Sequence, residues 1–356
     1  MNRRNILQAG LASVAVAGIA RAVMAQTPTN APAPAPVTGQ WSTVKPIPEG
    51  GNEVVGANVN GRFVTYGGLS DFNALGQFYS YDPKTDAWAK LPAHPLPIHH
   101  TAAVGIGNRF YLFGGLRKPA NGERVWMPVN ECWAFDFDTM KWTALAPMPT
   151  VRGALAAVAV GNRVHVIGGS TLPDYAKARQ GFTPAFGGEQ ASTHEIYDVQ
   201  SNQWTSARPM LTGRNHHGIG HINGKIYVVG GRVGSAFVGA STNIAANEAY
   251  DIATDTWLPR ALLPTSRSGV MCSVLDGRLH AIGGEGATGP FRGAFKEHEV
   301  YDPPSNTWLK AADMVTPRHA FAIATIDGRI YTATGMDKPG TGGGPATGVP
   351  VTEVWG

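Results

Sequence analysis

Short apolar runs recur along the chain, and pairs of small turn-forming residues separate them. Six such pairs combine Gly with Asn or Asp: Asn60-Gly61, Gly107-Asn108, Gly161-Asn162, Asn223-Gly224, Asp276-Gly277 and Asp327-Gly328. These residue types tolerate the positive φ angles that two-residue turns between antiparallel strands require. Each pair therefore predicts a β-hairpin, and six hairpins in a row predict an all-β fold.

A glycine doublet follows each turn at a fixed distance. Seven residues after the first turn residue come Gly67-Gly68, Gly114-Gly115, Gly168-Gly169, Gly230-Gly231, Gly283-Gly284 and, as the one departure, Thr334-Gly335. Successive doublets are 47 to 62 residues apart. A fixed internal spacing that recurs at this period is typical of a repeat protein.

A second pair of residues marks another part of each repeat. An aromatic residue is followed seven positions later by tryptophan: Tyr81/Trp88, Phe135/Trp142, Tyr197/Trp204, Tyr250/Trp257 and Tyr301/Trp308. Turn-forming residues such as Asp, Asn and Pro lie between the two members in most repeats. Each pair predicts a second hairpin whose alternating residues pack between neighbouring sheets.

The turn, the glycine doublet and the aromatic/Trp pair, in this order, resemble the Kelch repeat over roughly residues 41–356. The resemblance implies a six-bladed β-propeller of four-stranded blades around a central channel. The sixth repeat stops at Trp355 and Gly356 without an outer strand of its own. Residues 40–44 resemble that strand, so we expect the amino-terminal strand to complete the last blade.

The first 25 residues differ from the repeats and are typical of an export signal. Arg3 and Arg4 precede a moderately apolar stretch over residues 9–20, and Ala25 ends the expected cleavage site. The adjacent arginines indicate a twin-arginine signal and a periplasmic or secreted protein, with a general secretory signal as the alternative. Residues 26–39 are rich in Pro and Ala and predict an extended linker. Residues 40–356 then form the propeller.

Composition narrows the classes of function. Gly accounts for 45 of the 356 residues and charged residues for only 15%, which excludes coiled coils and charge-driven disorder. The formal net charge of +4 falls to +1 without the signal's Arg3, Arg4 and Arg21. A nearly neutral chain disfavours nucleic-acid binding, and no apolar run after residue 25 could span a membrane. Cys132 and Cys272 fall in different repeats, so we expect no disulfide between them.

Comparing the six repeats with one another identifies a coupled pair of charges. Ten residues before the second turn residue stand Gly51, Ile98, Arg152, Arg214, Arg267 and Arg318. Two residues before the recurring aromatic stand Tyr79, Trp133, Glu195, Glu248, Glu299 and Glu353. Arg and Glu occur together in repeats 3 to 6 and are both absent from repeats 1 and 2, which predicts partly buried ion pairs. Four arginines that face the channel as an anion site are the alternative.

The two positions after the arginine position supply candidate ligand-binding residues. The first holds Asn52, His99, Gly153, Asn215, Ser268 and His319, and the second holds Glu53, His100, Ala154, His216, Gly269 and Ala320. The Kelch resemblance implies that both positions open at the channel mouth. Imidazoles beside a carboxylate are suited to acid–base chemistry near neutral pH or to metal binding. We expect His99, His319 and Glu53 as catalytic groups, and Asn52, His100, Asn215, His216 and Ser268 as ligand-binding residues.

Loops that the resemblance places at the same mouth add polar and aromatic residues. They are Arg117, Lys118, Arg124, Trp126, Asp174, Tyr175, Lys177, Arg179, Arg232, Glu285, Phe291 and Arg292. Of these, we expect Arg117, Arg232 and Glu285 to bind the ligand. The mixture is suited to a small polar, anionic or sugar-like ligand, while ordinary solvated loop residues are the alternative. The sequence predicts no cofactor. A histidine-bound metal is an open alternative, which the absence of a His-x-His or paired-Cys spacing disfavours.

Three classes of function fit these observations. An exported propeller that binds a small polar or carbohydrate-like ligand, with isomerase-like acid–base chemistry, would resemble the sialic acid mutarotases. A non-catalytic module that binds a partner protein is the alternative, since this is the commonest use of Kelch propellers. A copper oxidase similar to galactose oxidase is disfavoured, because the chain has no Tyr-His dipeptide and its cysteines lie on predicted strands. Fold alone leaves open whether the chain is an enzyme.

Overall fold

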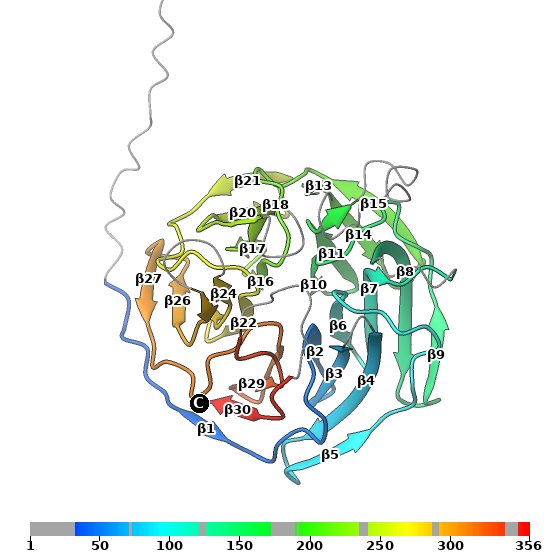
Figure 1. The fold of residues 1–356 in the computed structure, drawn as a ribbon. Coiled ribbons are helices and arrows are strands. Elements are labelled where there is room, and N and C mark those ends of the chain that lie inside the picture. Colours follow the sequence, from blue (N-terminus) through cyan, green and yellow to red (C-terminus); the bar gives the residue numbers. More distant parts are fainter. Residues whose placement is uncertain are drawn as a thin grey trace, which may run out of the picture.

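The computed structural model describes residues 33–70, 73–120, 126–171, 189–190, 192–234, 241–286, 292–338 and 348–356. Within these ranges the chain forms strands and no helix, and no helix there is long and apolar enough to cross a membrane. Six antiparallel four-stranded sheets stand around a central axis (Figure 1). The predicted six-bladed all-β propeller is therefore confirmed. The expected export signal lies outside the described residues.

In every blade the strands are arranged from the channel outward. The first blade comprises β2 (Val54–Val59), β3 (Arg62–Ser70), β4 (Asn73–Asp82) and β5 (Ala87–Lys90). The second comprises β6 (Ala102–Ile106), β7 (Arg109–Arg117), β8 (Met127–Asp136) and β9 (Lys141–Ala144). The third comprises β10 (Ala156–Val160), β11 (Arg163–Ile167), β14 (His194–Asp198) and β15 (Gln203–Ala207).

The remaining three blades follow the same order. The fourth comprises β16 (Gly218–Ile222), β17 (Lys225–Val229), β20 (Asn247–Asp251) and β21 (Thr256–Pro259). The fifth comprises β22 (Met271–Leu275), β23 (Arg278–Ile282), β26 (His298–Asp302) and β27 (Thr307–Lys310). The sixth comprises β28 (Ala322–Ile326), β29 (Arg329–Ala333), β30 (Thr352–Trp355) and β1 (Trp41–Thr43). Its outer strand thus comes from the amino-terminal side, with Trp41 opposite Trp355.

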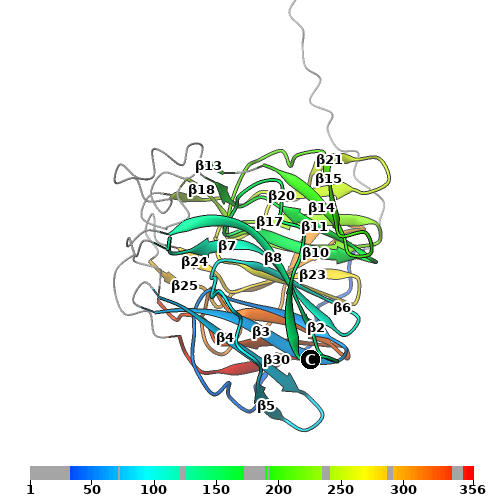
Figure 2. The ribbon, with the colours of Figure 1, turned by 90° about the vertical axis from the view of Figure 1, so that its right-hand side faces the viewer.

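Within the described ranges, short two-stranded sheets extend three of the blades. They are β12 (Ser170–Thr171) with β13 (Glu189–Gln190), β18 (Arg232–Gly234) with β19 (Ser241–Asn243), and β24 (Glu285–Gly286) with β25 (Gly293–Ala294). Figure 2 shows β13, β18, β24 and β25 on the same side of the disc. We call this side, where the inner strands begin, the mouth face. The two-residue hairpin turns lie on the opposite face.

The glycine doublets form joints between blades. The second glycine donates its N–H to the carbonyl at the arginine position of the next blade: Gly115 to Arg152 at 2.9 Å, Gly169 to Arg214 at 2.9 Å, Gly231 to Arg267 at 3.0 Å and Gly284 to Arg318 at 2.9 Å. The first glycine approaches the same carbonyl closely. A Cβ on Gly114, whose φ is +55°, would lie 2.5 Å from the Arg152 oxygen. This contact and this backbone conformation explain why glycine recurs here.

The aromatic/Trp pairs form a second set of joints near the outer rim. Each pair faces across the two outer strands, as Tyr301 does with Trp308, and their rings lie 5.2 Å apart. The indole N–H then crosses to the preceding blade, where Trp308 donates to the Ala261 carbonyl at 2.8 Å. Equivalent bonds join Trp41 to Ala312, Trp88 to Lys45, Trp142 to Pro92, Trp204 to Ala146 and Trp257 to Arg208.

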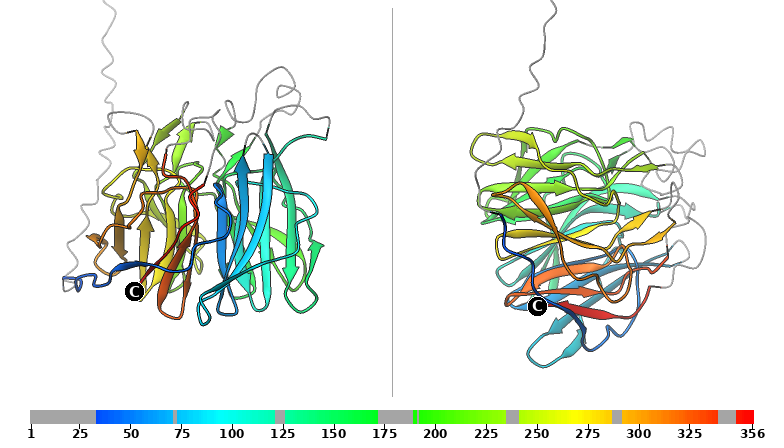
Figure 3. Two further views of the ribbon diagram at one scale, coloured as in Figure 1. Left: turned by 60° about the horizontal axis from the view of Figure 1, so that its bottom comes forward. Right: turned by 90° about the vertical axis from the view of Figure 1, so that its left-hand side faces the viewer.

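The hydrophobic core lies between the blades. Six clusters of buried side chains occupy the six contacts between neighbouring blades among the described residues. Figure 3 shows the blades packed face to face around the ring. Because every blade buries both of its faces against neighbours, the stability of each depends on the whole ring. Cys132 of the second blade and Cys272 of the fifth are free thiols.

Candidate binding site at the channel mouth

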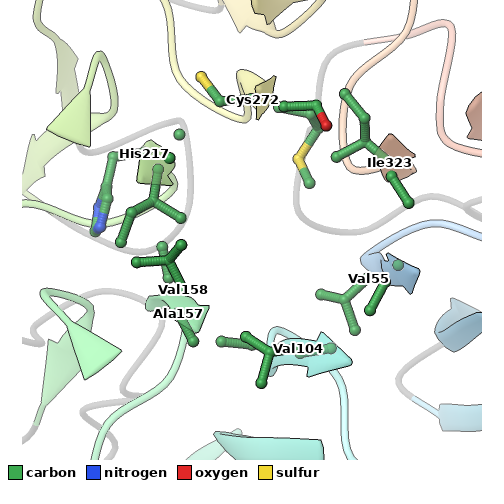
Figure 4. A pocket seen from close by; sticks show the side chains of 18 of the residues that line it. Val55, Val104, Ala157, Val158, His217, Cys272 and Ile323 are labelled. Atoms are coloured by element: carbon green, nitrogen blue, oxygen red, sulfur yellow. The ribbon is translucent and has the colours of Figure 1, made fainter. Parts of the chain in front are cut away.

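The inner strands enclose a central channel of about 500 Å³. Figure 4 shows side chains of Val55, Val104, Val158 and Ile323 around the open centre. These side chains are apolar, so this part of the channel wall offers few hydrogen-bonding groups. Polar side chains also line the channel, among them His217, Ser273 and Thr325.

Six equivalent residues, which we call the mouth ring, line the channel just before the inner strands. They are Glu53, His100, Ala154, His216, Gly269 and Ala320. All six have a left-handed backbone, with φ between 51° and 59°. Backbone hydrogen bonds connect the ring from blade to blade: Ala154 N to His100 O at 2.8 Å, His216 N to Ala154 O at 3.1 Å and Gly269 N to His216 O at 2.9 Å. The mouth ring is thus a fixed frame for its side chains.

The three polar members of the mouth ring converge, although they come from blades 1, 2 and 4. His100 Nε2 lies 3.3 Å from Glu53 Oε1. The imidazole rings of His100 and His216 are 5.0 Å apart and meet edge to face. One potential ligand atom from each of the three residues lies within 4.8 Å of the other two. This arrangement can form a hydrogen-bonded network or hold a metal ion.

A buried ion pair lies beside these residues. Arg232 Nη1 donates to Glu285 Oε1 at 2.6 Å and to Ser268 Oγ at 3.1 Å. Nη2 of Arg232 lies 3.0 Å from His216 Nε2, and His319 Nε2 lies 3.6 Å from Glu285 Oε2. We expected Arg232 and Glu285 in loops, but they begin the strands β18 and β24. The structure therefore brings these residues together at the mouth.

Three more of the expected residues lie behind the mouth ring. Asn215 Oδ1 accepts a hydrogen bond from His216 Nδ1 at 2.7 Å. His99 is completely buried against Trp126, with their rings 4.1 Å apart, and Asn52 Nδ2 donates to Met336 Sδ at 3.0 Å. Asn52, His99, Asn215, Ser268 and His319 are not among the residues that line the channel. They are placed to position the mouth ring and its neighbours.

Burial controls protonation at the mouth. Burial raises the pKa of Glu53 to about 8, with repulsion from Glu285 in the same direction and attraction to Arg232 opposing it. Burial lowers the pKa of His99 to about 3 and holds the pKa of His100 and of His216 well below the usual histidine value. At neutral pH these groups are neutral imidazoles beside a mostly protonated carboxyl. Such a set is better suited to hydrogen bonding than to binding a strong anion.

The arginines of blades 3 to 6 are held in the scaffold. Each contacts the glutamate of its own blade: Arg152 with Glu195 at 2.5 Å, Arg214 with Glu248 at 3.0 Å, Arg267 with Glu299 at 2.5 Å and Arg318 with Glu353 at 2.9 Å. The arginine side chains are completely buried. Three of them also donate to backbone carbonyls near the glycine doublets, as Arg152 does to Gly168 at 2.7 Å. An anion site made of these arginines does not fit this geometry.

The expected loop residues are only partly described. Arg117 is engaged in an ion pair with Glu131 at 2.7 Å, and Lys118 lies over the Trp126 ring at 5.7 Å. Arg292 directly precedes β25. Six other expected residues lie outside the described ranges: Arg124, Asp174, Tyr175, Lys177, Arg179 and Phe291.

Sequence reasoning missed two contacts of the site. Asn243 Nδ2 donates to the Glu285 carbonyl at 2.8 Å, and Met336 accepts from Asn52. Met336 directly follows the sixth doublet, at the position that Arg232 and Glu285 occupy in their blades. Comparing the residue after each doublet would have found Met336. In five blades this residue forms an isolated antiparallel β-bridge with the residue that directly follows the arginine position. Asn243 lies in a segment of variable length and gives no such signal.

Comparisons with known proteins agree with the repeat architecture. The profile of the KLHDC2/KLHL20/DRC7 Kelch-repeats domain matches residues 33–180, and that of the Kelch motif matches residues 213–261. Kelch-like protein terF of Aspergillus terreus is 25% identical over 340 residues, which cover 92% of this chain and 69% of terF. Human Kelch-like protein 15 is 25% identical over 241 residues, which cover 67% of this chain but only 38% of that protein. With six four-stranded blades built on these repeats, the chain belongs to the Kelch-repeat β-propeller family.

Proposed function

We propose that this chain is a protein-interaction module whose partner binds on the mouth face. The matched relatives are Kelch-like proteins, and the Kelch resemblance implies partner binding as the commonest use of such a propeller. The observation that carries the proposal is the convergence of polar side chains from several blades at the mouth of the channel. Recognition by fixed polar groups around a recess is typical of binding surfaces.

The mouth face also carries the added strands. β12–β13, β18–β19 and β24–β25 extend blades 3, 4 and 5 there (Figure 2). Val233 of β18 is 37% exposed, and the Arg117–Glu131 ion pair is partly accessible. By contrast, the described opposite face consists mainly of short turns. Extensions that differ in length between blades, carried on a rigid scaffold, favour the mouth face as the recognition surface.

A pair of substitutions on opposite faces tests the proposal. The partner is captured from the source organism on immobilised wild-type protein and identified, and its affinity is then measured with purified variants. Val233→Asp puts a charge on the mouth face and should weaken binding at least tenfold, or about 1.4 kcal/mol. Arg163→Ala is the control, because its side chain is 68% exposed and lies beside the opposite-face turn. Equal affinity of both variants and wild type would exclude the mouth face as the interface.

A small polar ligand is a second candidate, favoured by the channel volume. About 500 Å³ lies within the usual range for small-molecule pockets. The acid–base roles expected for His99, His319 and Glu53 belong to this candidate, and the comparisons contain nothing that points to a carbohydrate or to mutarotase chemistry. A thermal-shift screen of neutral sugars and sugar acids tests it. Saturable stabilisation that Glu53→Gln abolishes would support this candidate, and no stabilisation by any compound would contradict it.

A further inference from the structure

We propose that Glu53, His100 and His216 bind one divalent first-row transition-metal ion at the channel mouth. Donor atoms on one such ion, at bond lengths of about 2.0–2.2 Å, lie roughly 3–4 Å apart. His100 Nε2 and Glu53 Oε1 already satisfy this spacing at 3.3 Å. All three donors lie within 4.8 Å of one another, so a side-chain shift of about 1 Å completes the site.

The neighbouring residues orient both imidazoles for this role. His216 Nδ1 donates to Asn215 Oδ1 at 2.7 Å, which leaves the lone pair of His216 on Nε2. His100 Nδ1 contacts Nδ1 of His99, so His100 turns Nε2 toward Glu53. In metal sites the second ring nitrogen of a ligating histidine is typically held by such a partner, which fixes its tautomer and orientation. Here the residue directly before each histidine supplies that partner.

Arg232 is the group that must move. Its Nη2 lies 3.0 Å from His216 Nε2, so an ion has to displace this contact. Nη1 of Arg232 can keep its bonds to Glu285 and Ser268 while Nη2 withdraws. An ion that binds Glu53 displaces its proton, and Glu53 and Glu285 then supply two carboxylates beside the guanidinium of Arg232 and the divalent cation.

The donor set indicates the class of metal. Two imidazoles and one carboxylate favour zinc, iron, cobalt, nickel or manganese over calcium or magnesium, which prefer oxygen ligands. Three protein ligands leave coordination positions open for water or for an atom of a bound molecule. The inference does not depend on the proposed interaction function, because it concerns binding of the ion alone.

Titration of the purified full chain with Co²⁺ and with Zn²⁺, after removal of metal by a chelator, tests the inference by calorimetry. Wild type should bind one ion per chain. His216→Ala and His100→Ala should each weaken binding at least tenfold. His221→Ala is the matched control, since this histidine lines the channel near the far end of β16 and is not one of the three ligands, and it should bind as wild type does. Glu53→Gln keeps the size of the side chain and should also weaken binding, which separates ligand loss from misfolding.

Three results would overturn the inference. The first is the absence of saturable binding by wild type. The second is binding by Glu53→Gln and His216→Ala, each shown to be folded by its thermal melt, with wild-type affinity. A loss of binding in His194→Asn but not in His216→Ala would likewise contradict it, because the ion would then occupy the buried His165–His194 pair.

Discussion

A completely buried arginine requires a carboxylate within reach, and blades 3 to 6 each supply one. Arg214 and Glu248 illustrate the arrangement, since both are buried and their charged atoms lie 3.0 Å apart. Removing one partner leaves the other charge buried and uncompensated, whereas removing both does not. These pairs therefore hold the segment before the inner strand of each blade against the third strand of the same blade.

At this residue scale, Arg214→Ala should lower the free energy of unfolding by about 3 to 5 kcal/mol. The double variant Arg214→Ala/Glu248→Ala should recover part of that loss. Urea denaturation of wild type, both single variants and the double variant measures the coupling, with the exposed Arg163→Ala as control. Strictly additive losses, or no loss from Arg214→Ala, would show that the pair contributes nothing.

The pairing of these charges could be predicted because six copies of the repeat could be compared with one another. The orientation of the mouth residues could not. His99 and His100 are adjacent histidines, yet His100 lines the channel and His99 packs against Trp126. The left-handed backbone conformation at His100 makes the two neighbouring side chains point in different directions. No residue type in the sequence indicates that conformation.

At the scale of elements, β1 and the residues that follow it link the sixth blade to both of its neighbours. Trp41 pairs with Trp355 and donates its indole N–H to the Ala312 carbonyl of the preceding blade's outer segment. Farther along, the Lys45 carbonyl accepts the indole N–H of Trp88 in blade 1. The segment thus contributes contacts to three blades, although it forms only one short strand.

Deletion of residues 40–48 should therefore lower the melting midpoint of the whole propeller as one cooperative transition. The deletion exposes the edge of β30 and removes two indole–carbonyl joints. Calorimetry and circular dichroism should report the same lowered midpoint. A control that lacks only residues 26–32 should melt like the intact chain. Unchanged melting of the 40–48 deletion would refute a structural role for β1.

The elements themselves were largely predictable, since the turns, doublets and aromatic/Trp pairs recur at fixed distances. The added strands were not. β18 and β24 begin directly after their doublets, but the segments that follow differ in length, so no fixed position marks where these strands end or where their partner strands lie. The sequence therefore predicted Arg232 and Glu285 as loop residues rather than as strand residues.

At the scale of the whole molecule, buried histidines make stability depend on pH. Two pairs lie in blades 3 and 5: His165 Nδ1 and His194 Nε2 are 2.8 Å apart, as are His280 Nδ1 and His298 Nε2. Burial lowers the pKa of His165 and of His280 to about 4 and that of His194 to about 3, and it holds the pKa of His298 well below the usual value. The first histidine of each pair also lowers the pKa of the second by charge repulsion.

The unfolded chain binds protons on these groups near pH 6.5, whereas the folded chain binds them only near pH 4 or below. The contribution of these histidines to the free energy of unfolding should thus be fully present above about pH 6.5. It should decrease as the pH falls toward 4, by up to about 1.4 kcal/mol per pH unit for each histidine. The variant His165→Tyr/His194→Asn copies Tyr227 and Asn247 of blade 4 and should show a shallower decrease. Urea unfolding at pH 7 and pH 5 measures it, and equal slopes for variant and wild type would contradict the assignment.

Export also concerns the whole chain and stays a prediction from the sequence. We propose that residues 1–25 direct the protein through the twin-arginine route. Replacing Arg3 and Arg4 together with Lys should leave the uncleaved precursor in the cytoplasm, because that route depends on the paired arginines. Cell fractionation and immunoblotting read the result. Normal export of the double-lysine variant would favour the general secretory route instead.

We propose that the mouth face of this propeller is its binding surface. Hydrogen–deuterium exchange of the chain with and without its captured partner tests it most directly, since both faces report in one experiment. We expect new protection at the mouth in residues 98–101, 214–217, 232–234 and 285–286, with the turns at Asn60-Gly61 and Asp276-Gly277 unchanged. Protection confined to those opposite-face turns, with the mouth segments exchanging as in the free chain, would contradict it.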